Sequence, residues 1–211
     1  PTVMWEKCPN CLQKAKDENT DIKQLQQYFT NRIEKYLNSK GKSIIGWDEI
    51  LEGKINQSAT IMSWRGVEPG LKAAKQGHDV IMTPSSHVYF DHYQAKETKH
   101  EPDAIGGCSP VEKVYSYEPL PETLDAEAKN RIKGVQANLW TEYIPFTTQA
   151  EYMVLPRMAA LAEVQWTPAG QKNFDNFSKR ALRLSDLYDR YGYVYARHLW
   201  KEKAIPTSAL W

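Results

Sequence analysis

Three short apolar stretches of this chain end in a tryptophan followed within two residues by a charged side chain. The three ends are Trp47-Asp48-Glu49, Trp64-Arg65 and Trp140-Thr141-Glu142, and a fourth apolar stretch leads into Tyr89-Phe90-Asp91. An indole offers a flat apolar face to the C–H groups of a sugar ring, and a carboxylate accepts protons from its hydroxyls. Repetition of the arrangement at matching positions favours a binding surface over aromatic side chains that merely fill a core.

The elements that must position these residues follow from apolar spacing and turn signals. We expect buried strands at 43–47, 59–64, 79–83 and 134–140, each bounded by polar, Pro or Gly residues. Helical spacing predicts helices over 22–37, 69–76 and 174–191, a short helix near 124–131, and one helix over 148–166. Asp21 with Gln24, and Thr148 with Glu151, have the spacing of capping boxes. Between 84 and 124 we expect an extended loop.

Alternation of strands with helices or long crossovers predicts an α/β fold with a parallel sheet. Four such units resemble half of a (β/α)₈ barrel, which needs about 250 residues when complete. In a barrel all strands open their carboxyl ends on one face, so the tryptophans and acids would converge there. The rival is a small doubly wound sheet, but no Gly-rich phosphate turn follows the first strand.

Composition narrows the classes of partner. The 211 residues carry a formal charge of +1, which offers no electrostatic footprint for nucleic acid or an anionic membrane. The longest apolar stretch, 152–166, is interrupted by Arg157 and Glu163, so we expect no membrane span. Tryptophan and tyrosine are abundant, at 7 and 12, against 5 phenylalanines, and their polar tips suit a wet binding surface.

The cysteines and histidines indicate no metal site. Cys8-Pro9-Asn10-Cys11 lacks a second ligand pair, because Cys108 is the one other cysteine. Pro9 and Asn10 favour a turn in a loop rather than the helix start that a redox motif needs. The five histidines show no metal-binding helix spacing, and we expect no cofactor.

Four motifs in order closely resemble the β-N-acetylhexosaminidases of glycoside hydrolase family 20. They are Gly46-Trp47-Asp48-Glu49-Ile50, Met62-Ser63-Trp64-Arg65-Gly66, Tyr89-Phe90-Asp91 and Ala137-Asn138-Leu139-Trp140-Thr141-Glu142. The resemblance covers roughly residues 3–166, and the closing helix fits too. It implies a partial (β/α)₈ barrel, about strands five to eight with their helices. It predicts that residues 1–192 are the C-terminal half of such a catalytic domain, with 193–211 as an irregular tail.

The resemblance also implies residue roles. Trp47, Trp64 and Trp140 would wall the pocket for a terminal N-acetylhexosamine and its acetamido group. Tyr89 would donate its hydroxyl to the acetamido oxygen, and Asp91 and Glu142 would bind sugar hydroxyls. Enzymes of this family remove terminal GlcNAc or GalNAc from glycans with retention, and they depart from the two-carboxylate scheme because the acetamido oxygen itself attacks the anomeric carbon.

One part of the family pattern is missing. The catalytic pair in the family is the Asp-Glu of a His-x-Gly-Gly-Asp-Glu motif, which lies upstream of a segment like 1–11, and no Gly-Gly-Asp-Glu occurs here. Asp48-Glu49 belongs to the next strand end, so we do not assign it as the missing pair. The family arginine that grips the C3 and C4 hydroxyls is also absent. We therefore expect a chain that opens on Pro1, without a preceding Met, to be an inactive fragment holding one half of the pocket.

Two other interpretations stay open. A non-catalytic carbohydrate-binding module would use the same tryptophans and carboxylates, and a structural module would bind no sugar. A half-barrel would leave sheet edges unpaired and apolar surface bare, which predicts self-association. The sequence fixes neither a GlcNAc or GalNAc preference nor a compartment, although bacterial members of the family are often exported.

Overall fold

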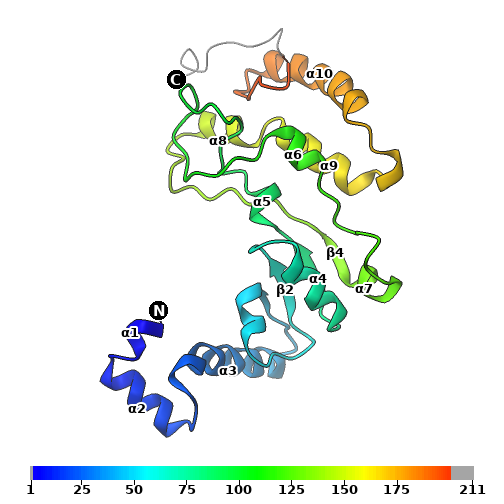
Figure 1. Cartoon of the computed structure of the whole chain (residues 1–211). Helices are drawn as coiled ribbons and strands as arrows, with labels where there is room; N and C mark the ends of the chain where they lie inside the picture. The colour runs from blue at the N-terminus through cyan, green and yellow to red at the C-terminus, as the bar shows by residue number, and fades with distance from the viewer. Residues whose placement is uncertain (1, 201–211) are drawn as a thin grey trace.

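The computed structural model describes residues 2–200 of the chain (Figure 1). The first half holds α1 (Thr2–Trp5), α2 (Pro9–Asp17), η1 (Ile22–Gln24), α3 (Leu25–Ser39), β1 (Ile45–Trp47), η2 (Asp48–Glu52), β2 (Thr60–Ser63), α4 (Glu68–Lys75), β3 (Val80–Met82) and α5 (Ser85–Val88). The second half holds α6 (Val111–Tyr115), α7 (Ala126–Arg131), β4 (Ile132–Val135), α8 (Thr147–Val154), α9 (Arg157–Trp166), η3 (Ala169–Gln171) and α10 (Phe174–Tyr191).

The four strands form one parallel sheet in the order β1-β2-β3-β4. Each strand therefore pairs with its neighbour in sequence, and the order nowhere reverses. A doubly wound sheet reverses its order at a switch point, whereas a barrel adds each strand beside the last. The order and the parallel pairing confirm the expected fold class, a partial (β/α)₈ barrel.

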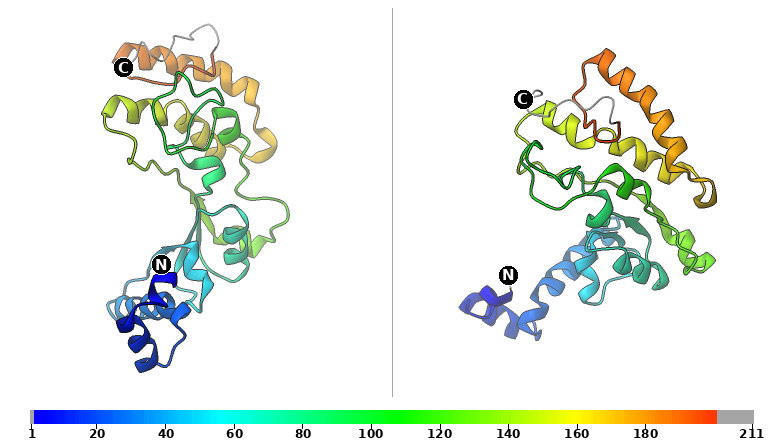
Figure 2. Two further views of the ribbon diagram at one scale, coloured as in Figure 1. Left: turned by 60° about the vertical axis from the view of Figure 1, so that its left-hand side comes forward. Right: turned by 45° about the horizontal axis from the view of Figure 1, so that its top comes forward.

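The core lies between the sheet and the helices that cover it. Ile61 of β2 and Val80 and Met82 of β3 are fully buried, and α4 packs against both strands. Figures 1 and 2 show α9 and α10 in layers beyond the sheet, while α1 and α2 lie at the far end of the molecule. β-branched and other apolar side chains on both faces of short strands are typical of a sheet that is covered on both sides.

The last helix is confirmed at both ends. The Asn173 side chain caps α10 by accepting from the Asn176 N–H at 2.9 Å. Gly192 ends α10 in the left-handed conformation at φ +72°, which a residue without Cβ adopts at little cost. Phe177 and Ala181 face inward and are buried, as the helical spacing predicts.

The first predicted helix starts later than expected. Asp21 accepts from the Lys23 N–H at 2.7 Å and caps the 3₁₀ turn η1, so α3 begins only at Leu25. Gln24 stands at the N-cap of α3 without a side-chain cap bond, and the Asp21–Gln24 capping box is wrong. The carboxylate of Asp21 satisfies the nearer amide, which tightens the chain before the α-helix starts.

The fourth strand was predicted too far along the chain. β4 covers Ile132–Val135 rather than 134–140, because its partner β3 ends at Met82. Beyond Val135 the Gln136 N–H still donates to Met82 O at 3.0 Å, and Asn138 then forms a separate parallel bridge with Tyr89 after the single turn of α5. The segment predicted as an extended loop also holds α5 and α6, each too short to show a helical period.

The predicted helix over 148–166 is two helices. α8 ends at Val154 and α9 begins at Arg157, with Pro156 between them. Proline lacks an amide hydrogen and disfavours a helical conformation in the residue before it, so the break was readable from Pro156. The Thr148–Glu151 capping box is wrong as well, because Glu151 accepts from the Val194 N–H at 3.0 Å.

The Cys8–Cys11 segment is helical rather than a loop. Cys8 stands at the N-cap of α2, with Pro9 at the first helical position. Proline is favoured there because the first turn of a helix has no internal use for its amide. Both cysteines are free and half-buried.

The segment after α10 has no helix or strand as far as Trp200. Tyr195, Ala196 and Trp200 are nevertheless buried against the body of the molecule. The remainder of the predicted tail, 201–211, lies outside the described residues, and the division at 192 stays a prediction. Among the helices of residues 2–200, none combines the length and the apolar character needed to cross a membrane.

Candidate active-site pocket

The six side chains predicted to bind sugar lie around one pocket of about 580 Å³. The lining includes Trp47, Trp64, Tyr89, Asp91, Trp140 and Glu142. Trp47 ends β1, Trp64 follows β2 directly, and the other four follow β3 and β4 along the chain. The pocket therefore lies beyond the carboxyl ends of the strands, where barrel enzymes place their active sites.

Aromatic rings line this pocket in two contacting pairs. The ring centroids of Trp47 and Trp140 are 5.9 Å apart at 49°, and those of Trp64 and Tyr89 are 6.4 Å apart and nearly parallel at 27°. Trp140 is 43% exposed, so part of its indole faces open space. These separations are typical of interacting aromatic pairs, which hold one another in fixed orientations.

The Asp48-Glu49 pair holds Trp64 in place. Asp48 is fully buried and its Oδ2 accepts from the backbone N–H groups of Trp64 and Arg65, at 2.9 and 3.1 Å. Glu49 lines the pocket, and its Oε2 accepts from Trp64 Nε1 at 2.9 Å. Because the Asp48 carboxylate is turned into the protein, this adjacent pair cannot act together on a ligand in the pocket.

Arg65 belongs to the same support and lies outside the pocket lining. Its Nε donates to Asp48 Oδ1, and its Nη1 donates to Glu52 Oε1 at 2.5 Å. The hydrogen bond to Glu52, followed by that to Asp48, raises the pKa of Arg65 above its usual value, against the effect of burial. The strand-end arginine thus joins β2 to η2 instead of offering its charge to a ligand.

Tyr89 presents a protonated phenol to the pocket. Burial raises the pKa of Tyr89, while hydrogen bonds with the side chains of Trp140 and Asn138 lower it less strongly. The backbone on either side is fixed, since the Phe90 N–H donates to Asn138 O at 2.7 Å and the Asn138 N–H donates to Val88 O at 3.0 Å. Tyr89 is therefore a positioned O–H donor throughout the neutral pH range.

Asp91 is a buried acid that faces the pocket. Its Oδ1 is inaccessible to solvent and lacks a hydrogen-bond partner within residues 2–200. Burial raises the pKa of Asp91, the positive charge of Arg157 lowers it, and the negative charge of Glu142 raises it. Because Asp91 also lines the pocket, it is a candidate acceptor for a ligand that donates hydrogen bonds.

Sequence reasoning missed one wall of the pocket. Ile105, Gly106 and Gly107 line it together with His92, whose ring centroid is 5.6 Å from that of Tyr89. Burial lowers the pKa of His92, so the ring is neutral at pH 7. Gly107 has φ +67°, and a Cβ there would lie 2.5 Å from His92 Nδ1. The adjacent glycines in a long loop were the available signal for this close approach.

Two further residues complete the lining. Glu49 was considered at the sequence level only as half of an adjacent acid pair, and Ser85 was not considered. Glu49 enters the pocket because η2 turns directly after Trp47 and because Trp64 holds its carboxylate. Ser85 enters because α5 begins there, immediately after the strand β3 and Pro84. Both Glu49 and Ser85 follow the end of a strand, which is the sequence feature from which Asp91 and Glu142 were predicted.

Comparison with known proteins gives a consistent assignment. The catalytic domain of glycosyl hydrolase family 20 matches residues 1–169. A beta-hexosaminidase of Porphyromonas gingivalis is 45% identical over 197 residues, which are 92% of this chain and 25% of that protein. A beta-hexosaminidase of Vibrio furnissii is 35% identical over 165 residues, covering 77% of this chain and 27% of that protein.

Solved structures agree. An exo beta-N-acetylglucosaminidase from Vibrio harveyi, determined in complex with N-acetylglucosamine, superposes with a TM-score of 0.82 at 33% identity. That match covers 93% of this chain and 31% of the Vibrio chain. The present chain thus spans about a quarter to a third of the length of these proteins. On the match over most of its length, the chain belongs to the catalytic domains of glycosyl hydrolase family 20.

Proposed function

We propose that the protein carrying this chain is a β-N-acetylhexosaminidase that removes terminal N-acetylhexosamine from glycans, and that this chain supplies one half of its substrate pocket. The observation that carries the proposal is the convergence of three tryptophans, Tyr89, Asp91 and Glu142 on one pocket at the strand ends. Indole faces for C–H groups, with carboxylates beside them for hydroxyls, are what a sugar ring requires.

The reaction follows from an acetamido group held against the anomeric carbon. The acetamido oxygen attacks that carbon, the glycosidic C–O bond breaks, and the leaving oxygen takes a proton from an acid. Water then opens the cyclic oxazolinium-like intermediate and gives the sugar with retained configuration. Tyr89 donates to the acetamido oxygen, and the walls of Trp47, Trp64 and Trp140 restrict the group to the attacking geometry, which is a proximity effect.

In the family pattern the acid and the residue that orients the acetamido group come from a Gly-Gly-Asp-Glu motif, which these 211 residues do not contain. The isolated 211-residue polypeptide is therefore expected to bind without hydrolysing. Asp91 and Glu142, which both line the pocket, hold sugar hydroxyls.

The test uses two chromogenic substrates on the protein as its gene encodes it. Nitrophenyl N-acetyl-β-glucosaminide should be hydrolysed, and nitrophenyl β-glucoside, which lacks the acetamido group, should not. Equal rates on both substrates would contradict acetamido participation. Saturable sugar binding without any hydrolysis would instead identify a carbohydrate-binding module, and the absence of both would leave a structural module.

The raised pKa of Asp91 predicts a pH dependence of sugar affinity. The ionised carboxylate accepts hydroxyl protons, so affinity for N-acetylglucosamine should rise as the pH passes upward through the folded-state pKa, which lies above the ordinary 3.8, and then level off. The free energy of unfolding changes in the opposite direction. The unfolded chain loses the Asp91 proton at a lower pH than the folded chain does, so stability falls as the pH rises through the same interval. Titrations between about pH 4 and pH 7 measure both. If an Asp91→Asn variant showed the same rise of affinity with pH, Asp91 would not be the group responsible for it.

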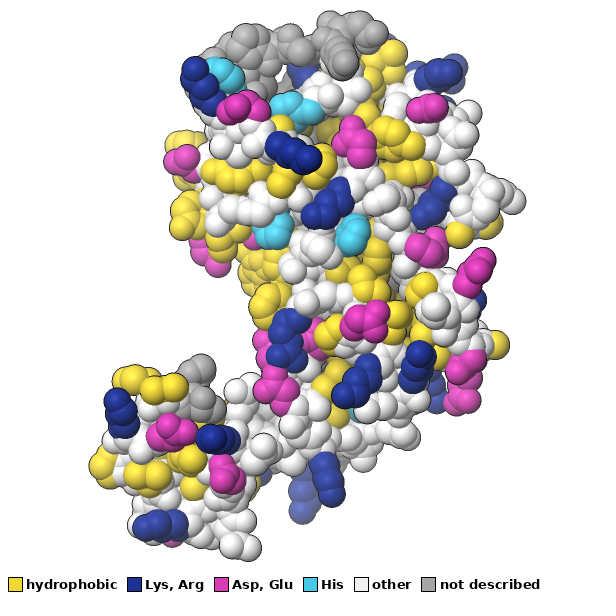
Figure 3. All heavy atoms as spheres, viewed as in Figure 1, with side chains coloured by type: hydrophobic (Ala, Val, Ile, Leu, Met, Phe, Trp, Pro, Cys, Tyr) yellow, Lys and Arg dark blue, Asp and Glu magenta, His cyan; other side chains and the backbone are white. Residues whose placement is uncertain are grey.

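Self-association of the isolated polypeptide is part of the proposal. Within residues 2–200, β1 pairs with β2 and β4 pairs with β3, so one edge of each outer strand is open. A hollow of about 540 Å³ beside β4 is bordered by Trp166, which is 88% exposed. Exposed apolar side chains also gather on the N-terminal helices at Val3, Met4 and Leu12 (Figure 3). Open edges and large apolar patches drive association, so light scattering should give a mass above 24.3 kDa, and a monomer would contradict this.

A further inference from the structure

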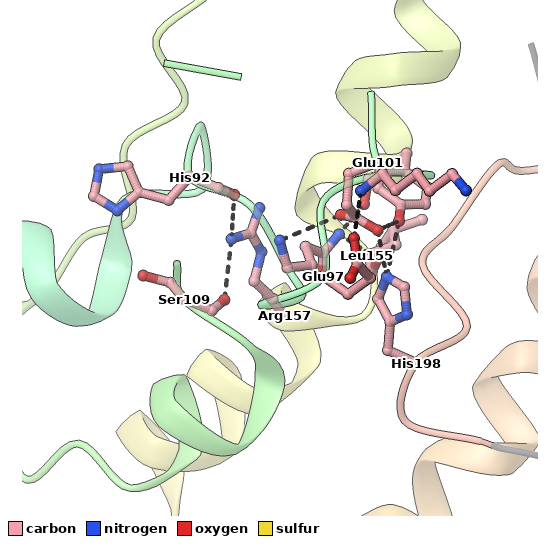
Figure 4. Close-up of polar contacts among 10 residues, drawn as sticks. His92, Glu97, Glu101, Ser109, Leu155, Arg157 and His198 are labelled. Carbon is pink, nitrogen blue, oxygen red and sulfur yellow. Dashed lines mark hydrogen bonds and ion pairs between the residues drawn. The ribbon is translucent and has the colours of Figure 1, made fainter. Parts of the chain in front are cut away.

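Arg157 is a fully buried cation at the start of α9, behind the pocket. Its guanidinium donates to backbone carbonyl oxygens from three segments of the chain. Nη1 lies 3.0 Å from His92 O and 3.1 Å from Ser109 O, Nη2 lies 2.5 Å from Phe90 O, and Nε lies 2.9 Å from Met153 O. Figure 4 shows Arg157 reaching the loop at both His92 and Ser109.

The surroundings of Arg157 explain how the charge is tolerated. Its guanidinium lies 4.8 Å from the centre of the Phe90 ring, which adds a cation–π contact to the carbonyl contacts. Burial lowers the pKa of Arg157 to about 9, so the side chain is charged at neutral pH. The ion pairs of residues 2–200 include no carboxylate bonded directly to it. Burying a cation costs free energy, and only a planar group with several donors can satisfy this many carbonyls at once.

Two of these carbonyls flank Asp91. Phe90 O belongs to the peptide group directly before Asp91, and His92 O belongs to the His92–Tyr93 peptide one residue further on, and both accept from the same guanidinium. The guanidinium therefore holds the backbone on both sides of Asp91, which restricts the direction of the Asp91 Cα–Cβ bond. The third carbonyl, Ser109 O, lies where the loop that carries Ile105–Gly107 returns, so the same side chain also closes the loop that forms the missed wall.

We propose that Arg157 is a positioning residue for substrate binding, which directs the Asp91 carboxylate into the pocket through the carbonyls of Phe90 and His92 without touching the ligand. The proposal rests on the proposed function, because it gives Asp91 a sugar hydroxyl to bind. Lysine at 157 would keep the charge but lacks the planar guanidinium that donates to several carbonyls at once. The hydrogen bonds to Phe90 O and His92 O would therefore not both form, and the backbone around Asp91 would be less restricted.

The test is a double-mutant cycle on the protein as its gene encodes it, with the thiazoline analogue of N-acetylglucosamine as the probe. Dissociation constants are measured for the unaltered protein, Arg157→Lys, Asp91→Asn and the double variant. We expect each single variant to bind about tenfold more weakly and the double variant to bind no more weakly than Asp91→Asn alone. Arg180→Lys is the matched control, since Arg180 pairs with Glu163 on the surface at 2.5 Å, and it should leave affinity unchanged.

Independent losses that multiply in the double variant would overturn the positioning role, because they would show that Arg157 acts on the whole fold. Failure of the unaltered protein to bind the thiazoline would overturn the proposed function instead. Phe90→Leu keeps the arginine and its carbonyl partners while removing the aromatic contact, and it serves where Arg157→Lys melts below the assay temperature. Its smaller loss of affinity should likewise vanish in the Asp91→Asn background, and persistence there would overturn the proposal.

Discussion

Tyr89→Phe in the protein as its gene encodes it is expected to lower kcat for nitrophenyl N-acetylglucosaminide about 100-fold, with little change in KM. The substitution removes one hydroxyl and keeps the ring that stacks with Trp64. In the proposed mechanism the lost hydrogen bond holds the acetamido oxygen as charge develops on the group, so the loss should appear in the transition state more than in the bound ground state. Steady-state kinetics separate the two constants.

Tyr143→Phe is the matched control for that experiment. Tyr143 is exposed and lies outside the lining of the sugar pocket, so loss of its hydroxyl should leave kcat unchanged. If Tyr89→Phe instead raised KM and left kcat within about threefold, Tyr89 would bind the sugar uniformly and would not align the acetamido oxygen.

Asp48→Asn is expected to lower the free energy of unfolding by about 2–3 kcal/mol, because it breaks a buried ion pair from its buried side. Asp48 accepts from two backbone amides and from Arg65, and an amide in its place turns one acceptor into a donor facing the guanidinium. We take a value below the usual range of about 3–5 kcal/mol because Arg65 is partly exposed and screened by solvent. For a chain of this size the melting temperature should fall by about 5–10 °C.

Glu52→Gln is the control for the ion pair. Glu52 contacts the same arginine at 2.5 Å but is largely exposed, so its removal should cost within about 0.5 kcal/mol. Equal melting shifts in Asp48→Asn and Glu52→Gln would contradict the structural role given to Asp48. The same result would reopen the adjacent acids as candidates for chemistry.

The strand ends could be predicted from sequence because the relevant information is local. Trp47, Trp64 and Trp140 each follow a short apolar stretch, and parallel strands bring their carboxyl ends to one edge regardless of the exact pairing. The predicted convergence of these residues therefore did not depend on the exact bounds of β4, which were wrong by several residues. Tyr89 and Asn138 pair beyond the end of the β3–β4 ladder and keep the two segments together.

The supports of the pocket could not be predicted, because they join residues far apart in sequence. Arg157 contacts the carbonyl of Phe90, 67 positions away, and backbone carbonyls carry no sequence signature. At the sequence level Arg157 only interrupted an apolar stretch, and His92 was one of several polar loop residues. The break at Pro156 was readable, and missing it hid the position of Arg157 at the start of a helix.

The central claim is that indole faces in this pocket hold an amino sugar, and a titration of the thiazoline analogue of N-acetylglucosamine, followed by intrinsic fluorescence, tests it most directly. Trp140→Ala should weaken binding by about tenfold or more, because it removes a wall of the pocket. Trp166→Ala is the matched control, since Trp166 is exposed beside β4 in a different hollow, and it should bind like the unaltered protein. Equal affinities for the Trp140→Ala variant and the unaltered protein would contradict the account.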